Sequence, residues 1–175
     1  MSVIIRNAVP ADVEQITLVH IESWKTTYRG IFPDDWLDKS PETIAKNIEN
    51  RRVRIAQDTD LGWPNLVAIL DNKIVGWAAG GVNRNADFPY QADLCAIYLL
   101  KEYQNQGIGK LLVRSFAELV LKNRMQSMII WALEENYKAR RFYEKLGGKP
   151  AGTMLYRDKY PEVGFGFDNV REIIM

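Results

Sequence analysis

The segment QNQGIGKLL, residues 104–112, constrains the fold most, because it joins a predicted strand to a predicted helix through two glycines. Residues 92–99 before it are apolar, and the apolar residues after it recur at helical spacing. At such a junction, the unpaired N–H groups and the dipole of the helix N-terminus create an anion site. Glycine lets a diphosphate approach the backbone, and Lys110 is a further donor. The alternative is a tight connection between strand and helix that binds nothing.

Two other glycine motifs are excluded by single residues. A Walker A phosphate loop needs glycine at position 104 and serine or threonine at position 111, where the chain has Gln104 and Leu111. A dinucleotide-binding fingerprint over Gly107 and Gly109 needs a third glycine at position 112, where the chain has Leu112. A nucleotide hydrolase is therefore disfavoured.

The other elements follow from turn residues and from the period of the apolar residues. These patterns predict strands over residues 2–8, 66–70, 74–82, 92–99, 127–133, 153–157 and 163–167. They predict helices over residues 10–29, 40–50, 107–124 and 136–146, a loop at 32–35, and either helix or strand at 53–60. This order predicts an α/β fold, a mixed sheet of about seven strands with helices on both faces. A length of 175 residues fits one domain, residues 1–175.

Composition limits the partners. Apolar residues make up 47% of the chain and the net charge is +1, so the overall charge gives no reason to expect nucleic acid or anionic lipid as a partner. No apolar run approaches the ~20 residues of a membrane span. The basic cluster RRVR, residues 51–54, is either a solvated face or a patch that steers an anionic ligand.

The single cysteine and the single histidine exclude further classes of site. Cys95 has no partner for an intramolecular disulfide, and together with a start unlike a signal peptide this favours a cytoplasmic setting. Because Cys95 lies in an apolar stretch, we expect it to pack in the core. His20 is the only histidine, so no metal site is expected.

Two motifs resemble those of the GCN5-related N-acetyltransferase (GNAT) family. LCAIYLLKEYQNQGIGKLLV, residues 94–113, resembles its acetyl-CoA motif, a strand followed by Q/R-x-x-G-x-G/A at the start of a helix. NYKARRFYEKLGG, residues 136–148, is similar to its next motif, N-x-x-A-x-x-F-Y-E-K-x-G-F. IESWKTTYRGIFPDDWL (residues 21–37) together with VGFGFDNV (residues 163–170) resembles a bacterial branch whose acceptors are mainly unassigned.

The departures from the family pattern are modest. Gln104 replaces the commoner arginine, Leu100 replaces a frequent proline, and Gly148 stands where phenylalanine is usual. Asp93 occupies a position that is often glutamate, and only this departure bears on a catalytic assignment.

The resemblance implies the GNAT fold, a mostly antiparallel sheet, and transfer of an acetyl group from acetyl-CoA to a primary amine by direct attack. The amine belongs to a small molecule or a peptide. It must be neutral to attack, although a free alkylamine has a pKa of about 10. The carbonyl oxygen needs hydrogen-bond donors as it gains charge, and the leaving sulfur benefits from a proton donor.

The resemblance also assigns the residues that bind acetyl-CoA. The main chain of Ile97, Tyr98 and Leu99 is expected to pair with the pantetheine arm, and the N–H of Leu99 to polarise the thioester carbonyl. Asn136 either binds the end of the pantetheine or only caps its helix. The pyrophosphate is expected to lie on the residues of the glycine turn, Gln104, Asn105, Gln106, Gly107, Ile108, Gly109 and Lys110.

The catalytic assignments are hypotheses. Tyr143 is the candidate general acid and is also expected to contact acetyl-CoA, and the alternative is a buried structural tyrosine. Asp93 is the candidate base, acting through water, with His20 and Glu22 as rivals. The aromatic residues Trp24, Tyr28 and Phe32 are candidates for the acceptor pocket, although aromatics four residues apart on a helix usually pack in the core.

Two functions compete at this point. The first is the N-acetyltransferase, and the second is a non-catalytic module that senses or binds acyl-CoA. Tyr143 and Asp93 argue for the enzyme. The sequence leaves the acceptor open among polyamines, amino acids, antibiotics and protein or peptide amines. A homodimer is an expectation at the level of the family only.

Overall fold

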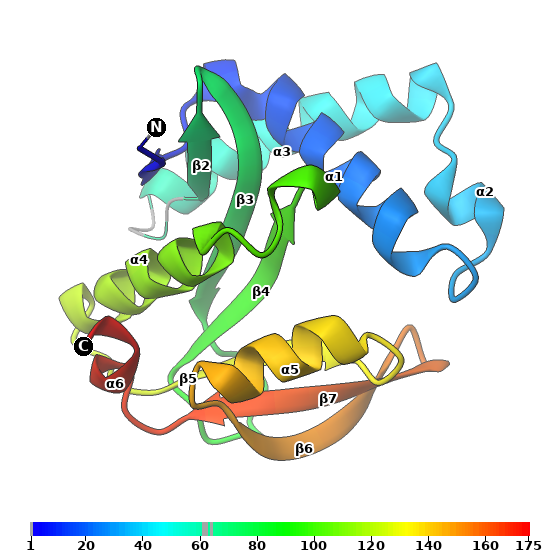
Figure 1. Ribbon diagram of the computed structural model, residues 1–175. Helices are drawn as coiled ribbons and strands as arrows, with labels where there is room; N and C mark the ends of the chain where they lie inside the picture. The colour runs from blue at the N-terminus through cyan, green and yellow to red at the C-terminus, as the bar shows by residue number, and fades with distance from the viewer. Residues whose placement is uncertain (1, 61–62, 64) are drawn as a thin grey trace. The chain divides into compact units, whose positions relative to one another are not determined.

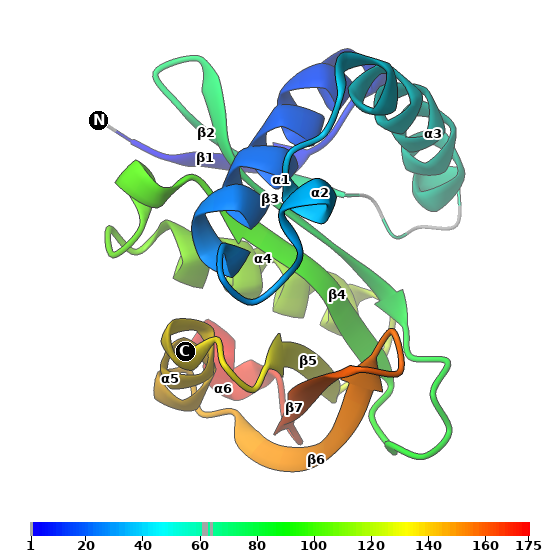
Figure 2. The same cartoon turned by 90° about the vertical axis from the view of Figure 1, so that its right-hand side faces the viewer.

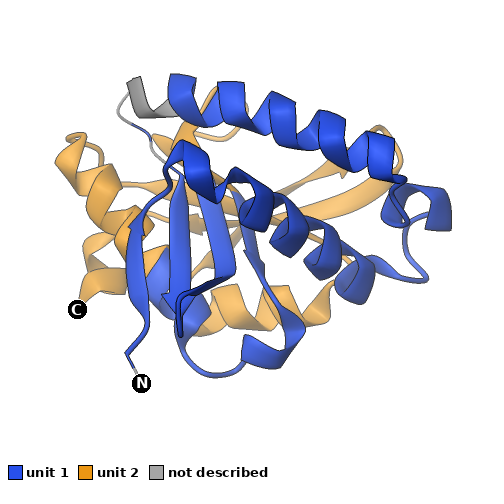
Figure 3. Ribbon diagram, turned by 90° about the horizontal axis from the view of Figure 1, so that it is seen from above, with its two compact units in different colours: residues 1–79, 96–112 blue, residues 80–95, 113–175 orange. Residues whose placement is uncertain are grey.

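The computed structural model describes residues 2–60, 63 and 65–175. These residues fall into two compact units, which Figure 3 distinguishes by colour. Unit 1 comprises Met1–Ala79 and Ala96–Leu112, and unit 2 comprises Gly80–Cys95 and Val113–Met175. Each unit is therefore built from two separate stretches of the chain.

Within the described residues, seven strands form one sheet in the order β1-β2-β3-β4-β5-β7-β6. Strands β4 and β5 pair in parallel, whereas the pairs β1–β2, β2–β3, β5–β7 and β6–β7 are antiparallel. The predicted mixed and mostly antiparallel sheet is confirmed. The strands are β1 (Ile4–Asn7), β2 (Leu66–Leu70), β3 (Lys73–Val82), β4 (Ala92–Leu99), β5 (Met128–Leu133), β6 (Lys149–Tyr156) and β7 (Tyr160–Phe167).

In unit 1, two long helices pack together, α1 (Val13–Tyr28) and α3 (Pro41–Asp60) (Figure 1). The side chain of Asp12 fixes the start of α1, because it accepts a hydrogen bond from the N–H of Val9 at 2.8 Å and pairs with Arg6 at 2.6 Å. The buried face of α1 then joins a core with α3, β2 and β3 that consists of Ala8, Val13, Ile16, Val19, Ile55, Val67, Ile74 and Trp77.

Helices cover both faces of β3 within unit 1. A Cβ atom added to Gly76 would lie 3.2 Å from the side chain of Leu112, in the first turns of α4 (Ile108–Lys122). The next residue, Trp77, lies on the other face, where its ring meets His20 of α1. The predicted placement of helices on both faces is confirmed.

In unit 2, β7 lies between β5 and β6, and α5 (Tyr137–Lys145) packs on β7 (Figure 2). Tyr143 of α5 meets Phe165 of β7, so that face of the strand carries the core. The opposite face has glycines: a Cβ atom added to Gly164 would lie 2.9 Å from the ring of Trp131. Residues of β7 that share a face with Gly164 therefore lie away from α5.

The boundaries differ from the prediction in a few places. Residues 53–60, which the sequence left open, continue α3 to Asp60. The predicted loop at 32–35 contains the start of a short helix, α2 (Asp34–Leu37), and a last helix, α6 (Arg171–Ile174), was not predicted. Strands β6 and β7 are both longer than the five residues predicted for each. They pair over residues 149–156 and 160–166. In the described part of the chain, no helix is long and apolar enough to cross a membrane.

Candidate active site

The glycine turn between β4 and α4 lies in unit 1 and has the geometry of an open helix N-terminus. Asn105 has φ +61° and Gly107 has φ +83°, so the backbone turns through left-handed conformations before α4 starts at Ile108. The N–H of Leu111 already bonds the carbonyl of Gly107. The N–H groups of Ile108, Gly109 and Lys110 precede that bond and belong to the first turn, which has no acceptors within the helix. Gly107 is exposed, with nothing within 4 Å of where its Cβ would be.

The two glutamines of the turn hold its shape. Gln104 donates from Nε2 to the carbonyl oxygen of Leu99 at 3.2 Å, and Gln106 donates to that of Glu102 at 2.9 Å. The N–H of Leu100 bonds the carbonyl of Val75, which fixes the end of β4 against β3. The side chains of Ile97, Tyr98 and Leu99 are half-buried. Thus Gln104 and Gln106 brace the turn, and a contact between their side chains and a pyrophosphate stays a prediction.

Helix α5 in unit 2 starts as predicted. Asn136 is its N-cap, because Oδ1 accepts a hydrogen bond from the N–H of Ala139 at 3.2 Å. The cap does not use the amide nitrogen of Asn136. Tyr143 is 4% exposed, and its ring lies 5.4 Å from that of Phe142 and 5.7 Å from that of Phe165. The buried position of Tyr143 fits both the predicted acid and the structural alternative.

Asp93, the candidate base, lies in unit 2 near a second carboxylate. Its partner in the strand pairing is Ile129 of β5, and one carboxylate oxygen is buried without a hydrogen-bond partner among the described residues. Burial raises the pKa of Asp93 to about 6, against a lowering contribution from Cys95. An unpaired buried carboxylate oxygen is a site where a proton or a donor is strongly favoured.

The second carboxylate belongs to Glu162, which is not among the candidates predicted from the sequence. Ile129 pairs with Gly166 and Leu133 pairs with Glu162, so the alternation of the strands places Asp93 and Glu162 on the same face, away from α5. Burial, and then the charge of Asp93, raise the pKa of Glu162 to about 7. The sequence signal was a glutamate in phase with Gly164 and Gly166 and out of phase with the phenylalanines of β7.

The predicted position of Cys95 in the core is wrong. Cys95 is exposed, and its thiol lies 3.6 Å from the carbonyl oxygen of Asp93. The reason is the alternation of β4, since Cys95 lies on the face opposite to that of Leu94, which points to the core and is 1% exposed.

His20, one of the rival bases, lies in unit 1 and makes a specific contact. Its Nδ1 lies 2.9 Å from Nη2 of Arg51. A guanidinium only donates, so Nδ1 accepts and the ring is neutral with its proton on Nε2. Burial, and then the charges of Arg51 and Lys39, lower the pKa of His20 to about 3.

The three predicted acceptor-pocket residues pack on one another. Trp24 lies 5.3 Å from Tyr28 and 5.4 Å from Phe32 between ring centroids, and Tyr28 lies 5.0 Å from Phe32. Phe32 is 5% exposed, as expected for core packing. Trp24 also meets His20 at 5.2 Å. A role of the three residues in acceptor binding stays a prediction.

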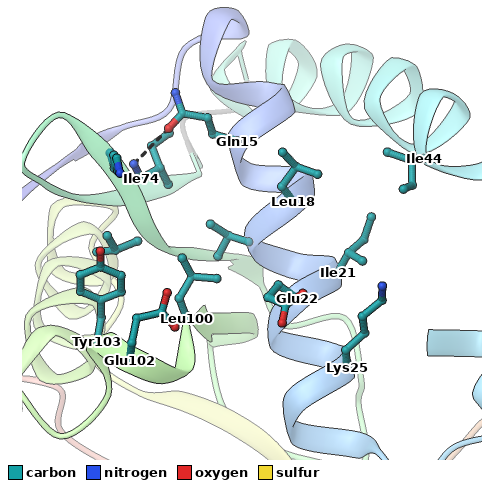
Figure 4. A pocket seen from close by; sticks show the side chains of 13 residues that line it. Gln15, Leu18, Ile21, Glu22, Lys25, Ile44, Ile74, Leu100, Glu102 and Tyr103 are labelled. Carbon is teal, nitrogen blue, oxygen red and sulfur yellow. Dashed lines mark hydrogen bonds between the residues drawn. The ribbon is translucent and has the colours of Figure 1, made fainter. Parts of the chain in front are cut away.

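A cavity of about 550 Å³ lies in unit 1, beside the part of α1 that carries Leu18, Glu22 and Lys25 (Figure 4). Leu18, Ile21 and Leu100 give it an apolar lining, and Glu22 and Glu102 face it with their carboxylates. Glu22 is therefore at a cavity, as a candidate base requires, but Trp24, Tyr28 and Phe32 do not line this cavity. Among the described residues, no three His, Cys, Asp or Glu side chains are grouped to hold a metal ion.

Comparison with known proteins identifies the family. The family model described as "Acetyltransferase (GNAT) family" matches residues 21–148. An uncharacterized N-acetyltransferase of Bacillus subtilis, YuaI, is 35% identical over 138 residues, which are 77% of this chain and 73% of YuaI. A spermidine N(1)-acetyltransferase of Thermoplasma acidophilum is 27% identical over 87% of this chain and 92% of its own.

Solved structures show the same fold. The PaiA N-acetyltransferase of Thermoplasma acidophilum, crystallised in complex with coenzyme A, matches with a TM-score of 0.77 at 23% identity. The match covers 95% of this chain and all of the PaiA chain, 100%. With the motifs at residues 94–113 and 136–148 inside the matched range, the chain belongs to the GNAT family and is an acetyl-CoA-dependent N-acetyltransferase.

Proposed function

We propose that this enzyme transfers the acetyl group of acetyl-CoA directly to a primary amine of a small molecule or a peptide, without an acetylated enzyme. The amine nitrogen attacks the thioester carbonyl carbon, the C–N bond forms, and the C–S bond breaks. The amine loses one proton, and the departing sulfur takes up one proton. Atoms and charges then balance with an amide and the free thiol of coenzyme A as products.

The observation that carries the proposal is the carboxylate of Asp93. A buried carboxylate oxygen without a partner, on a group whose pKa is about 6, can accept a proton near neutral pH. We assign Asp93 as the base that receives the amine proton through water, with Glu162 as its neighbour on the same face. Binding of acyl-CoA alone does not require such a group.

His20 is a weaker candidate for the base. Its Nδ1 accepts a hydrogen bond from Arg51, and a pKa of about 3 leaves the ring with little affinity for a proton at neutral pH. The remaining nitrogen carries the ring proton and cannot accept another. Glu22 stays a candidate through its position at the cavity beside α1.

Tyr143 is assigned as the acid that protonates the leaving sulfur. The first-turn N–H groups of α4 and Lys110 are assigned to the pyrophosphate, because they are donors at an exposed turn with no internal acceptors. The main chain of Ile97–Leu99 and the amide nitrogen of Asn136 are assigned to the pantetheine. We further propose that residues 1–175 act as a single catalytic domain, since the family model spans stretches of both units.

The test is release of coenzyme A thiol from acetyl-CoA in the presence of a panel of amines, with product masses measured in parallel. Acetylated amine and thiol in equal amounts support direct transfer. Tight binding of coenzyme A with no turnover on any amine would favour the sensor. Turnover that Asp93→Asn leaves unchanged at every pH would remove Asp93 from the role of base.

A further inference from the structure

Arg51 differs from its neighbours in the basic cluster at residues 51–54. Its guanidinium lies over the ring of Trp77, with Cζ 4.3 Å from the ring centroid, and it donates to His20. The next residue, Arg52, is 47% exposed and pairs with Glu49 at 3.0 Å. Among the described residues, no carboxylate pairs with Arg51. Arg51 is thus a half-buried cation without a counter-ion.

Two buried donors beside His20 also lack acceptors. Nε of Arg51 and Nε1 of Trp24 are both buried, and neither has a hydrogen-bond partner in the described part of the chain. Both residues adjoin the same ring, because Arg51 lies 2.9 Å from Nδ1 of His20 and the ring of Trp24 lies 5.2 Å from that of His20. Buried donors are normally paired, so this grouping lacks an acceptor.

The contacts that Arg51 does make leave its charge uncompensated. The face of Trp77 attracts the cation but accepts no N–H bond in the guanidinium plane. His20 accepts one bond and is neutral, so it contributes no negative charge. A planar guanidinium offers several N–H donors in a fork that fits two oxygens of one carboxylate or phosphate group.

We propose that Arg51 and Trp24 bind an anionic group of the acceptor, so that the acceptor class is amines that also carry a carboxylate or a phosphonate. This inference rests on the proposed function and deepens it. Amino acids and their phosphonate analogues have this chemistry, whereas polyamines do not. The enzyme should therefore differ in its acceptor from the spermidine N(1)-acetyltransferase to which it is similar.

The experiment compares acceptors that share a side chain and differ in the anionic group, with kcat/KM expressed per neutral amine because the anionic group also shifts the pKa of the amine. Tyrosine is paired with tyramine, methionine with 3-(methylthio)propylamine, and each amino acid with its aminophosphonate. For the wild type we expect kcat/KM at least about 10-fold higher for the anionic member, since hydrogen bonds to charged groups have this size. Arg51→Gln should lower kcat/KM for the anionic member about 10- to 100-fold and change that for the plain amine less than about 2-fold. The carboxylate and phosphonate arms show which oxyanion is preferred.

Three controls separate binding from folding. Arg52→Gln removes an exposed charge from the same helix and should leave both members of each pair unchanged. Arg51→Lys keeps the charge without the fork and should give an intermediate loss. The KM for acetyl-CoA should stay the same in all variants.

Several outcomes would overturn the inference. Equal loss of kcat/KM for both members of a pair in Arg51→Gln would make Arg51 structural. A wild-type preference for the plain amines would reject the proposed anion-binding site and leave the proposed function intact. If no amine is acetylated, the proposed function fails, and the Arg51 site is tested by calorimetry with N-acetyltyrosine on the protein saturated with coenzyme A. Binding that Arg51→Gln abolishes supports the site, and no binding to the wild type rejects it.

Discussion

Asp93 on β4 and Glu162 on β7 lie on one face of the sheet in unit 2, close enough for the charge of Asp93 to raise the pKa of Glu162. Burial raises the pKa of Asp93 to about 6, and burial and the charge of Asp93 raise that of Glu162 to about 7. The two groups therefore titrate as a pair, and each can be removed separately to learn which one acts in catalysis.

The first prediction is a pH profile that assigns the base. We expect kcat/KM of the wild type to rise with pH through about 6, as Asp93 becomes ionised. Asp93→Asn should remove this limb and lower kcat/KM by roughly 10²- to 10⁴-fold. Glu162→Gln should keep the limb near pH 6, because burial, and not Glu162, is what raises the pKa of Asp93. The reverse pattern, with the limb lost in Glu162→Gln and kept in Asp93→Asn, would make Glu162 the base.

The second prediction concerns stability against pH. Asp93 and Glu162 have ordinary pKa values of 3.8 and 4.5 and folded values of about 6 and 7, so the folded chain holds more protons in this range. Their contribution is fully present below about pH 4 and is lost progressively as the pH rises to about 7. Glu162→Gln should therefore gain stability relative to the wild type as the pH rises from about 5 to 8. Urea unfolding at a series of pH values measures this, and parallel curves for the two proteins would contradict it.

His20 contributes with the opposite sign, and its removal is a useful check. Its pKa falls from 6.5 to about 3 on folding, so the unfolded chain binds the extra proton and stability rises with pH between about 3 and 6.5. His20→Asn should lose this rise and keep the decline that Asp93 and Glu162 cause between about pH 4 and 7, so its stability relative to the wild type should fall as the pH rises from about 3 to 6.5. A stability difference between His20→Asn and the wild type that stays constant over this range would contradict the lowered pKa of His20.

The local elements of the fold were predictable because their signals are local. Asp71 and Asn72 both adopt positive φ in the turn between β2 and β3, a conformation that Asp and Asn tolerate and that a tight hairpin uses. Asn136 caps α5 as predicted, since an asparagine before a helical pattern satisfies the first N–H groups. The strand at residues 92–99 is confirmed to the residue.

The site features that were missed depend on contacts between distant segments. Nothing near Arg51 in the sequence shows that it will lie over Trp77 rather than in solvent like Arg52. Glu162 became a candidate only when the strand register placed it on the face of Asp93. Cys95 was misplaced because an apolar neighbourhood does not say which face of β4 is open.

The third prediction tests Tyr143 as the acid. Tyr143→Phe removes only the hydroxyl and keeps the ring that packs against Phe142 and Phe165. If the hydroxyl protonates the sulfur, kcat should fall roughly 10²-fold or more, with little change in the Kd of coenzyme A. Tyr137→Phe, at a residue of the same helix that is 63% exposed, is the matched control and should behave as the wild type. Full kcat in Tyr143→Phe across the pH range would leave Tyr143 with a structural role only.

The fourth prediction separates the conformation of the glycine turn from its binding role. Gly107 and Gly30 have φ of +83° and +85°, and at both positions an added Cβ would meet nothing within 4 Å. Alanine at either position should therefore lower the free energy of unfolding by a similar amount, about 1–2 kcal/mol, from backbone strain alone.

Gly107→Ala should in addition raise the Kd of coenzyme A, because strain moves the N–H groups at the start of α4 and the methyl group occupies the approach of the pyrophosphate. Gly30→Ala, in the connection after α1, should leave that Kd unchanged, as measured by calorimetry. Equal Kd values in the two variants would remove the turn from the binding of coenzyme A.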